Sequence, residues 1–391
     1  MRILIIHNRY QVRGGEEECY EAEVSLLQQM GHQVQVYEEN NNHLTALNTA
    51  ALAVRTVWSQ KTYEDIKHCL KQRPSDVVHV HNFFPLISPS IYYAAKSEGV
   101  PVVQTLHNYR LLCPNGLFFR DEQVCEDCMG KVIPYPGVLR SCYRNSQIAS
   151  AGVATMLGVH RAMRSWTGMV DLYICLTEFA KQKFIEGGLP PSKILVKPNF
   201  VNPDSGAGSG SGDYALFVGR LSTEKGLDTL LSAWEHLNTH IPLKIVGDGP
   251  LANYVAQAVK DLPQVEWLGR KSMAEVHALM GEAMFLVFPS KWYETFGRVA
   301  IEAFAKGTPV IAANIGAISE IVVDGRTGLH FQPGVAEDLV DKVKWILTNP
   351  EKLTQMRHEA RREFEAKYTA HNNYEQLINI YTKAQIASTK N

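Results

Sequence analysis

The strongest constraint on this chain is a repeated order of a short apolar run, a turn rich in Gly or charge, and a stretch with helical spacing. The first repeat has an apolar run at residues 3–6, then Gly14 and Gly15, an amphipathic stretch at 17–30 and a second strand at 33–37. Further strands are predicted at residues 77–81, 102–106, 172–176 and 194–196. Strands alternating with helices indicate a parallel α/β sheet.

The pattern begins again after residues 205–212, which are only Gly, Ala and Ser. Such a run cannot bury a core and is typical of a flexible linker or exposed loop, with a surface insertion as the alternative. A chain of 391 residues also exceeds one ordinary core. Later strands are predicted at residues 215–218, 243–246, 265–268, 285–288, 309–312 and 328–331.

We therefore predict two Rossmann-like, doubly wound parallel-sheet domains that face a central cleft. The first comprises residues 1–203 and a C-terminal helix, 373–391, that crosses back to it. A Gly/Ser linker at 204–212 leads to the second domain, residues 213–372. In such sheets ligands bind beyond the carboxyl ends of the strands.

Composition excludes several classes of protein. The net charge is -1, from 39 Lys and Arg against 40 Asp and Glu, which argues against a dedicated nucleic-acid binder. Apolar residues at 45% and charged residues at 20% are typical of a soluble globular chain. Neither a secretory signal nor a membrane-spanning stretch is apparent, so we expect a cytoplasmic protein.

Residues 288–307, FPSKWYETFGRVAIEAFAKG, carry the clearest chemical signal. A strand is predicted to end at Pro289, and a helix to begin near residues 295–297, where free backbone N–H groups bind anions or oxygen atoms. Glu294 stands just ahead of the helix, and Glu302 lies about two turns along it. Two carboxylates so placed can hold hydroxyls of two sugar rings; a solvated Glu and a capping Glu are the alternative.

The seven residues between Glu294 and Glu302 resemble the E-x7-E motif of family 4 glycosyltransferases (group 1), retaining enzymes of the GT-B fold. The resemblance covers nearly the whole chain, through Gly14-Gly15, His107, VGRLSTEKGLD at 218–228 and GDGP at 247–250. It implies a metal-independent transferase that moves a hexose from a nucleotide-sugar to a glycan or lipid-linked acceptor in polysaccharide synthesis. UDP is expected because it is the commonest donor nucleotide of the family, and UDP-glucose is an example.

The resemblance also implies roles for individual residues. Arg220 and Lys225 grip the donor diphosphate, as two fixed cations can without a metal. Glu302 binds the ribose. Glu294 binds the transferred sugar, and the N–H groups of Thr295, Phe296 and Gly297 assist it.

Other positions follow from the same resemblance. Gly15 allows close approach to the diphosphate, Gly247 leaves room for the nucleoside, and Arg270 and Lys271 lie near the base. His107 faces the donor sugar and completes a catalytic set with Arg220, Lys225 and Glu294. The alternatives are a loop at Gly15, a tight turn at Gly247, surface charge at Arg220 and Lys225, and a buried structural role for His107.

The expected mechanism is front-face transfer, in which the leaving phosphate oxygen takes the acceptor proton. No carboxylate in the N-terminal motifs is an evident nucleophile, and no D-x-D pair is placed to hold Mg²⁺ on the donor. We therefore expect neither a cofactor nor a catalytic metal. The alternatives are a nucleotide-sugar epimerase, a phosphorylase (which would show a pyridoxal lysine and a longer chain) and a non-catalytic nucleotide-sugar-binding protein.

Three further features stay open. Cys113, Cys125, Cys128 and Cys142 resemble the ligand spacing of a structural zinc site, with free thiols or a disulfide as alternatives. His79 and His81 sit at a strand end and could line the acceptor side. Basic residues at 161–166 and 181–183 could touch an anionic membrane surface, with a solvated helix face as the alternative.

Overall fold

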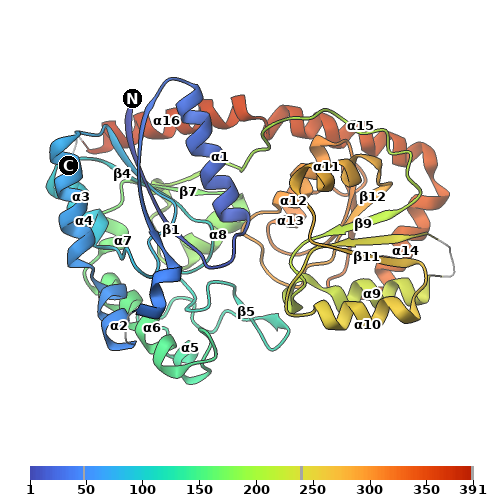
Figure 1. The fold of residues 1–391 in the computed structure, drawn as a ribbon, viewed down its shortest axis with the longest axis horizontal. Helices are drawn as coiled ribbons and strands as arrows, with labels where there is room; N and C mark the ends of the chain where they lie inside the picture. The colour runs from blue at the N-terminus through green and yellow to red at the C-terminus, as the bar shows by residue number, and fades with distance from the viewer. Residues whose placement is uncertain (47–48, 238–240, 389–391) are drawn as a thin grey trace. The chain divides into compact units, whose positions relative to one another are not determined.

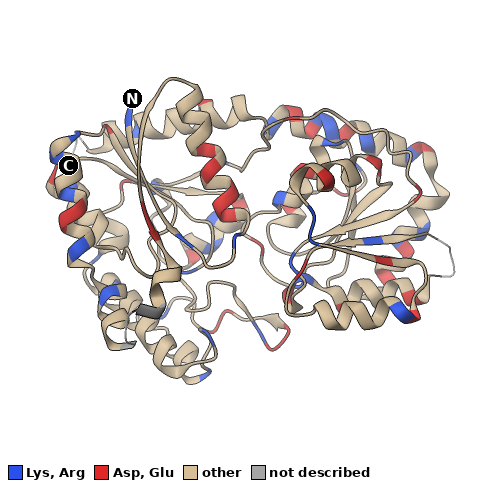
Figure 2. Cartoon of the chain, viewed as in Figure 1, with Lys and Arg blue, Asp and Glu red and all other residues tan. Residues whose placement is uncertain are grey.

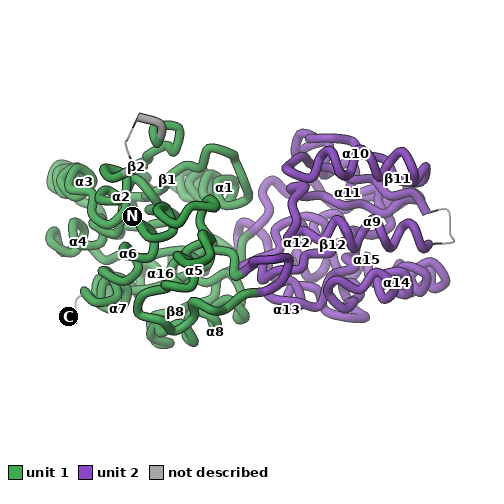
Figure 3. The backbone as a smooth tube through the Cα atoms, turned by 90° about the horizontal axis from the view of Figure 1, so that it is seen from below, with its two compact units in different colours: residues 1–118, 125–199, 373–391 green, residues 119–124, 200–372 purple. Residues whose placement is uncertain are grey.

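The computed structural model describes residues 1–46, 49–237 and 241–388. It divides into two compact units, each built around one parallel sheet (Figures 1 and 3). Unit 1 comprises residues 1–118, 125–199 and 373–391, and unit 2 comprises residues 119–124 and 200–372.

Unit 1 contains a six-stranded sheet in which every neighbouring pair of strands is parallel. Its strands, in spatial order, are β2 (Gln33–Asn40), β1 (Arg2–Arg9), β3 (Val77–Val80), β4 (Val102–Thr105), β7 (Leu172–Cys175) and β8 (Ile194–Val196). β3, β4 and β7 are buried along their whole length, as apolar strands covered on both faces must be. Its helices are α1 (Gly15–Gln29), α2 (Thr49–Val57), α3 (Gln60–Gln72), α4 (Ser90–Ser97), α5 (Tyr135–Leu139), α6 (Gln147–Ala162), α7 (Ser165–Gly168) and α8 (Glu178–Glu186).

Unit 2 contains a second six-stranded parallel sheet. Its strands, in spatial order, are β11 (Val265–Gly269), β10 (Leu243–Val246), β9 (Ala215–Val218), β12 (Phe285–Phe288), β13 (Val310–Ala313) and β14 (Gly328–Phe331). Its helices are α9 (Leu227–His236), α10 (Ala252–Asp261), α11 (Met273–Glu282), α12 (Arg298–Ala305), α13 (Ile318–Ile321), α14 (Ala336–Thr348) and α15 (Pro350–Lys367). Basic and acidic residues are interspersed along α15 (Figure 2). The two doubly wound parallel sheets that the sequence predicts are confirmed.

Strand order fixes where each sheet can bind a ligand. In unit 2 the chain builds outward from β9 to β11, then returns to the other side of β9 with β12. In unit 1 the same reversal falls between β1 and β3. The connections that leave two such neighbouring strands diverge, so a crevice opens at their carboxyl ends.

The last helix, α16 (Ala370–Ser388), packs into the core of unit 1. Leu377, Ile380, Tyr381 and Ala384 are buried there against residues of β1, β3 and β4. This placement comes from the apolar stripe of the helix, whose other face is exposed.

Residues 204–212, predicted as a Gly/Ser linker, run along unit 2 rather than as free chain. The backbone N–H groups of Gly208, Gly210 and Gly212 donate to carbonyls of Lys306, Gly281 and Glu282 at 2.8–2.9 Å. Backbone hydrogen bonding holds this segment although its side chains are too small to bury a core. The assignment of residues 204–212 as a linker between two domains stays a prediction.

Small elements lie outside the two six-stranded sheets. β5 (Phe119–Arg120) and β6 (Gln123–Val124) form an antiparallel hairpin, and η3 (Thr223–Lys225) is a single 3₁₀ turn. Further 3₁₀ turns are η1 (Asn41–Ala46) and η2 (Pro191–Lys193). In the described ranges, every helix is too short or too polar to cross a bilayer.

Candidate functional site

The loops after β9 and β12 meet at the reversal point of the unit 2 sheet. Gly226 has φ +70°, and a Cβ placed on it would lie 1.9 Å from the carbonyl oxygen of Pro289. Only Gly allows this approach, which places η3 beside the loop that leads to α12. Lys225, the last residue of η3, is thereby brought to Glu294.

Glu294 is the centre of a compact polar cluster. Its Oε1 accepts hydrogen bonds from Ser290 Oγ at 3.1 Å and from Trp292 Nε1 at 3.0 Å, and it forms an ion pair with the ammonium of Lys225. Lys225 Nζ also lies 5.4 Å from the ring centroid of Trp292. A carboxylate with these donors is an anchored acceptor of hydrogen bonds, because its charge is balanced and its orientation is set.

Glu302 lies inside α12 and is 4% exposed. Arg298, one turn earlier on the helix, places Nε 2.9 Å from Glu302 Oε1. Each carboxylate of the pair therefore has its own cation. This arrangement favours binding of hydroxyl groups, because each carboxylate offers hydrogen-bond acceptors in a fixed place.

The other residues of unit 2 predicted to bind the donor lie on the loops after β9, β10, β11 and β12. Arg220 directly follows β9 and Gly219, and its side chain is exposed. Gly247 follows β10 with φ +142°, and an added Cβ would lie 1.8 Å from the carbonyl oxygen of Gly219. The loops after β9 and β10 are thus in backbone contact, as Leu221 N to Asp248 O at 3.0 Å also shows.

Thr295 and Phe296 are buried, and Gly297 is the N-cap of α12. Arg270 and Lys271 follow β11, the edge strand of the sheet, where Lys271 lies 3.7 Å from Glu275. Two strands, β10 and β9, separate β11 from β12, so this pair lies to one side of the Glu294 cluster.

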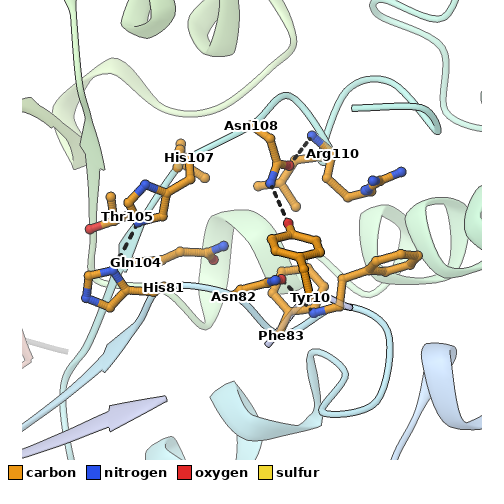
Figure 4. Close-up of a pocket in the computed structure, with 12 residues that line it drawn as sticks. Tyr10, His81, Asn82, Phe83, Gln104, Thr105, His107, Asn108 and Arg110 are labelled. Carbon is orange, nitrogen blue, oxygen red and sulfur yellow. Dashed lines mark hydrogen bonds between the residues drawn. The ribbon is translucent and has the colours of Figure 1, made fainter. Parts of the chain in front are cut away.

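Unit 1 has a pocket at its own reversal point, beyond the ends of β1, β3 and β4 (Figure 4). Tyr10 comes from the loop after β1, His81 and Asn82 follow β3, and His107 and Asn108 follow β4. Asn8 and Asn82 fasten the first two loops: Asn8 N donates to Asn82 O, and Asn82 Nδ2 to Asn8 O, both at 2.9 Å. The pocket is lined by Tyr10, His81, Asn82, Phe83, Phe84, Gln104, Thr105, Leu106, His107, Asn108, Arg110 and Leu111.

Glu16 supports one wall of this pocket from behind. Its Oε2 accepts hydrogen bonds from Tyr10 OH at 3.1 Å and from Asn108 Nδ2 at 3.3 Å. Burial raises the pKa of Glu16 to about 8, partly offset by those two donors. Gly15 is the first residue of α1 in the same unit, and the neighbouring Gly14 N–H is bound by Glu17 at 2.9 Å.

A chain of histidines runs from the pocket into the core. His107 Nε2 lies 3.0 Å from His81 Nδ1, and the rings of His81 and His79 lie 4.3 Å apart. Burial lowers the pKa of His107 to about 3 and holds those of His79 and His81 well below their usual range. All three are therefore neutral imidazoles at physiological pH, and His81 orients His107 by hydrogen bonding.

His79 departs from the prediction that it lines the acceptor side. It lies within β3, fully buried, with Nδ1 2.7 Å from Tyr381 OH and Nε2 2.8 Å from Thr105 Oγ1. A side chain at an inner position of a central strand faces a covering helix, here α16, and not the strand end. His81, two residues on, is the one that reaches the pocket.

Glu23, His79 and His81 are the group among the described residues whose potential metal ligands lie within 4.8 Å of one another. Lys197 Nζ, itself buried, lies 3.3 Å from Glu23 Oε2 and already balances this carboxylate. Both nitrogens of His79 are hydrogen-bonded as well. A divalent ion would add buried charge without a counter-charge, so we assign no metal here.

Several residues of the two sites were not found from the sequence. Trp292 and Ser290 stand inside the 288–307 motif, and Arg298 precedes Glu302 by four residues, a spacing that signals a helical ion pair. Tyr10 and Glu16 carry no comparable signal, because their partner Asn108 is about 90 residues away in the chain.

Two doubly wound parallel sheets, each with a polar site at the carboxyl ends of its reversal-point strands, define a glycosyltransferase-type GT-B fold. Solved structures share it: HepE of Anabaena in complex with UDP has a TM-score of 0.70 at 18% identity and covers 98% of this chain and 100% of its own. Sucrose-phosphate synthase of Thermosynechococcus elongatus has a TM-score of 0.72 at 18% identity, with 99% of each chain covered. Identities this low establish the fold alone.

Two family signatures match consecutive parts of the chain. Glycosyltransferase Family 4 matches residues 13–205, and Glycosyl transferases group 1 matches residues 205–363. The chain belongs to this family of glycosyltransferases, which is a retaining family.

Curated relatives match over part of their length. An uncharacterized glycosyltransferase of Methanocaldococcus jannaschii is 34% identical over 201 residues, 51% of this chain and 56% of that protein. The lipopolysaccharide 1,2-N-acetylglucosaminetransferase of Salmonella typhimurium is 28% identical over 236 residues, 54% of this chain and 62% of that protein. Glycogen synthase of Mycobacterium tuberculosis is 36% identical over 141 residues, 34% of each chain. The chain thus spans between a third and about three fifths of these relatives.

Proposed function

We propose that this protein transfers a hexose, with retention of anomeric configuration, from a UDP-sugar such as UDP-glucose to a glycan or lipid-linked acceptor in polysaccharide synthesis. The observation that carries the proposal is the Lys225–Glu294 ion pair at the reversal point of the unit 2 sheet. It places a cation for a diphosphate and an anchored acceptor for sugar hydroxyls side by side, where ligands of such sheets bind.

On binding, the donor would form new contacts with Lys225 and Glu294, which contact each other in this structure. The diphosphate takes up Lys225 and Arg220, Glu294 accepts hydrogen bonds from the sugar hydroxyls, and Glu302 accepts from the ribose. Lys225 keeps 21% of its side-chain surface exposed and Arg220 is exposed, so both can reach an incoming anion. Two cations suffice to stabilise the leaving diphosphate, so we propose that catalysis needs no metal.

The reaction would proceed on one face of the sugar. The bond between the anomeric carbon and the phosphate oxygen breaks, the acceptor oxygen bonds to the same carbon, and the acceptor proton passes to the departing phosphate. Negative charge grows on the diphosphate during this step, so Lys225 and Arg220 act more strongly on the transition state than on the bound donor. The neutral His107 serves as a hydrogen-bonding group that positions the reacting sugar.

The unit 1 pocket is the proposed acceptor site. Amide, imidazole and phenol groups of Asn82, Gln104, His107, Asn108 and Tyr10 offer hydrogen bonds of both directions to hydroxyls. Arg110 lies over the ring of Phe84, 4.6 Å from its centroid, and adds further hydrogen-bond donors next to these polar groups.

A membrane-bound acceptor would need a contact surface, and the basic segments predicted for it are occupied within unit 1. Trp166 is 4% exposed, and Arg161 donates to the carbonyl of Leu111 at 2.8 Å. Lys183 pairs with Glu126 at 2.9 Å, and Lys181 with Glu178 at 3.0 Å. A peripheral location at the inner membrane face therefore stays a prediction that these residues do not support.

The test is nucleotide release from a panel of UDP-, GDP- and ADP-sugars, with and without mixed glycan and lipid-linked acceptors. The proposal expects acceptor-dependent release of UDP, and a product whose anomeric configuration equals that of the donor. Epimerised donor without an acceptor would indicate an epimerase. Donor binding without release under any condition would indicate a binding protein. Either of these results, or release of GDP or ADP instead of UDP, contradicts the proposal.

A further inference from the structure

Residues 108–146 of the loop-rich region after β4 have little regular structure to hold them. Their elements are two strands of two residues, β5 and β6, and the five-residue α5. Of the eight non-glycine residues with positive φ in the described chain, six lie here: Phe118, Asp121, Glu122, Ser141, Arg144 and Asn145. Positive φ values are disfavoured for non-glycine residues. Contacts with other parts of the chain must therefore hold the backbone of residues 108–146 in place.

Three segments that carry cysteines of this region meet at Gly137. A Cβ placed on Gly137 would lie 3.4 Å from Cys128 Sγ and 2.8 Å from Cγ of Pro114, the residue after Cys113. The backbone N–H of Cys142 donates to the carbonyl of Gly137 at 2.9 Å. Parts of the chain that are separate in sequence thus bring Cys128 itself, the neighbour of Cys113 and the backbone of Cys142 to one small residue. Cys125 joins them because only two residues separate it from Cys128.

The four thiols share one electrostatic environment. Cys113, Cys125 and Cys142 each lie near enough to Cys128 for a charge on any of them to act on its thiol. All seven cysteines of the chain are described and none is in a disulfide. No three of the four Sγ atoms lie within 4.8 Å of one another, so a shared ligand would have to draw them closer together.

We propose that Cys113, Cys125, Cys128 and Cys142 bind one structural Zn²⁺ ion. Zinc takes four thiolates in a tetrahedron, and a Cys-x2-Cys pair with two further cysteines is a usual way to supply them. On binding, each thiol releases its proton to solvent and forms one Zn–S bond, so the closed site carries a charge of 2−.

The guanidinium of Arg161 can balance part of that negative charge. Arg161, on α6, is electrostatically coupled to Cys128. Its guanidinium donates to the carbonyls of Leu111 and Val132 at 2.8 and 3.2 Å. These carbonyls belong to the segments that precede Cys113 and follow Cys128. Arg161 therefore fastens both sides of the proposed site and supplies a positive charge next to it, as groups around metal ligands commonly do.

The site would also steady the unit 1 pocket. Arg110 and Leu111, which line it, lie within three residues of Cys113. Loss of the metal would free this wall of the pocket, whereas the strands that carry His81 and His107 would stay in place.

The experiment is metal analysis of the untagged full-length chain by inductively coupled plasma mass spectrometry. The expected content is about one zinc per chain. Replacement with Co²⁺ should give the intense visible bands of tetrahedral thiolate coordination. Zinc-free protein from zinc-replete cells, iron with labile sulfide, or a Cys125–Cys128 disulfide by mass spectrometry would each overturn the proposal.

Two pairs of variants make the assignment specific. Cys142→His should keep the zinc because imidazole is also a zinc ligand, and Cys142→Ser should lose it. Cys128→Ser should lose it too, whereas Cys69→Ser, a change to a thiol outside the region, should keep it. If Cys128→Ser and Cys69→Ser retain equal zinc, the metal lies elsewhere. The metal content of the parent protein decides the question even if Cys128→Ser does not fold.

Discussion

Glu294 and Glu302 owe their behaviour to the side chains around them. Each forms an ion pair with a cation that the fold holds in place, Lys225 across two loops and Arg298 along one helix. A carboxylate in that setting is held in one orientation, which suits recognition of hydroxyls. In the proposed reaction the charge that changes lies on the diphosphate, so Lys225 and Arg220 would stabilise the transition state.

Glu16 makes a prediction about pH. Its pKa is raised to about 8, so between about pH 4.5 and 8 the folded protein holds a proton that the unfolded chain does not. The free energy of unfolding therefore falls as pH rises through this window. In Glu16→Gln this part of the decline should be absent. Melting temperatures measured across the window check it, with Glu64→Gln on the exposed face of α3 as the control. Parallel curves for the parent and Glu16→Gln would contradict the assigned pKa.

At the residue scale the sequence indicated where candidate site residues lie in the chain, but not which side chains they contact. The 288–307 motif identified Glu294 and Glu302, because the strand, loop and helix around them are contiguous in the chain. The Glu16, Tyr10 and Asn108 cluster could not be predicted, since it depends on how the loops after β1 and β4 meet. The position of His79 was misjudged because a one-strand pattern does not give the exact strand end.

Among the elements, the loop after β10 depends on a close backbone contact with the loop after β9. Gly247→Ala should cost more than about 2 kcal/mol, since the new Cβ meets the carbonyl of Gly219 and the backbone has a φ that only Gly adopts readily. Gly325→Ala is the matched control. It has φ +72° with open space around the Cβ, so only the conformational cost of about 1 kcal/mol remains. Urea unfolding measures both, and equal losses would show that contact with Gly219 does not matter.

Helix α16 should support unit 1 and not unit 2. Leu377→Ala removes a fully buried side chain and should cost about 2–5 kcal/mol, whereas Ile386→Ala, at 52% exposure, should change stability by less than about 0.5 kcal/mol. Hydrogen exchange by mass spectrometry locates the effect. Protection should fall in β1 and β3 and stay unchanged in β9 and β12. Equal loss in both sheets would contradict the assignment of this helix to the unit 1 core.

Local pattern predicted these elements well, and tertiary contacts explain what it missed. Alternating apolar runs and helical stretches indicated every strand of the two sheets, since buried parallel strands are continuous apolar segments. Residues 204–212 looked like free chain because composition reports side chains only. Their backbone groups find partners on α11 and α12 that no local pattern shows.

At the scale of the molecule, the two units share the same arrangement of sheet and polar site. Each sheet reverses its building direction once, and each reversal point gathers the polar groups of that unit: Lys225 and Glu294 in unit 2, His81 and Asn108 in unit 1. The fold class followed from the sequence because the strand and helix order repeats. Strand order did not, since it is set by which strands pair in space.

The most direct test of this account is the rate of acceptor-dependent nucleotide release by Lys225→Ala, compared with Lys260→Ala, which removes an exposed lysine of the same unit. If Lys225 stabilises the leaving diphosphate, its loss should lower kcat by roughly 10²–10³ while Lys260→Ala matches the parent. A Lys225→Ala protein that is folded and releases nucleotide at the parent rate would contradict the assignment of the Lys225–Glu294 cluster as the donor site.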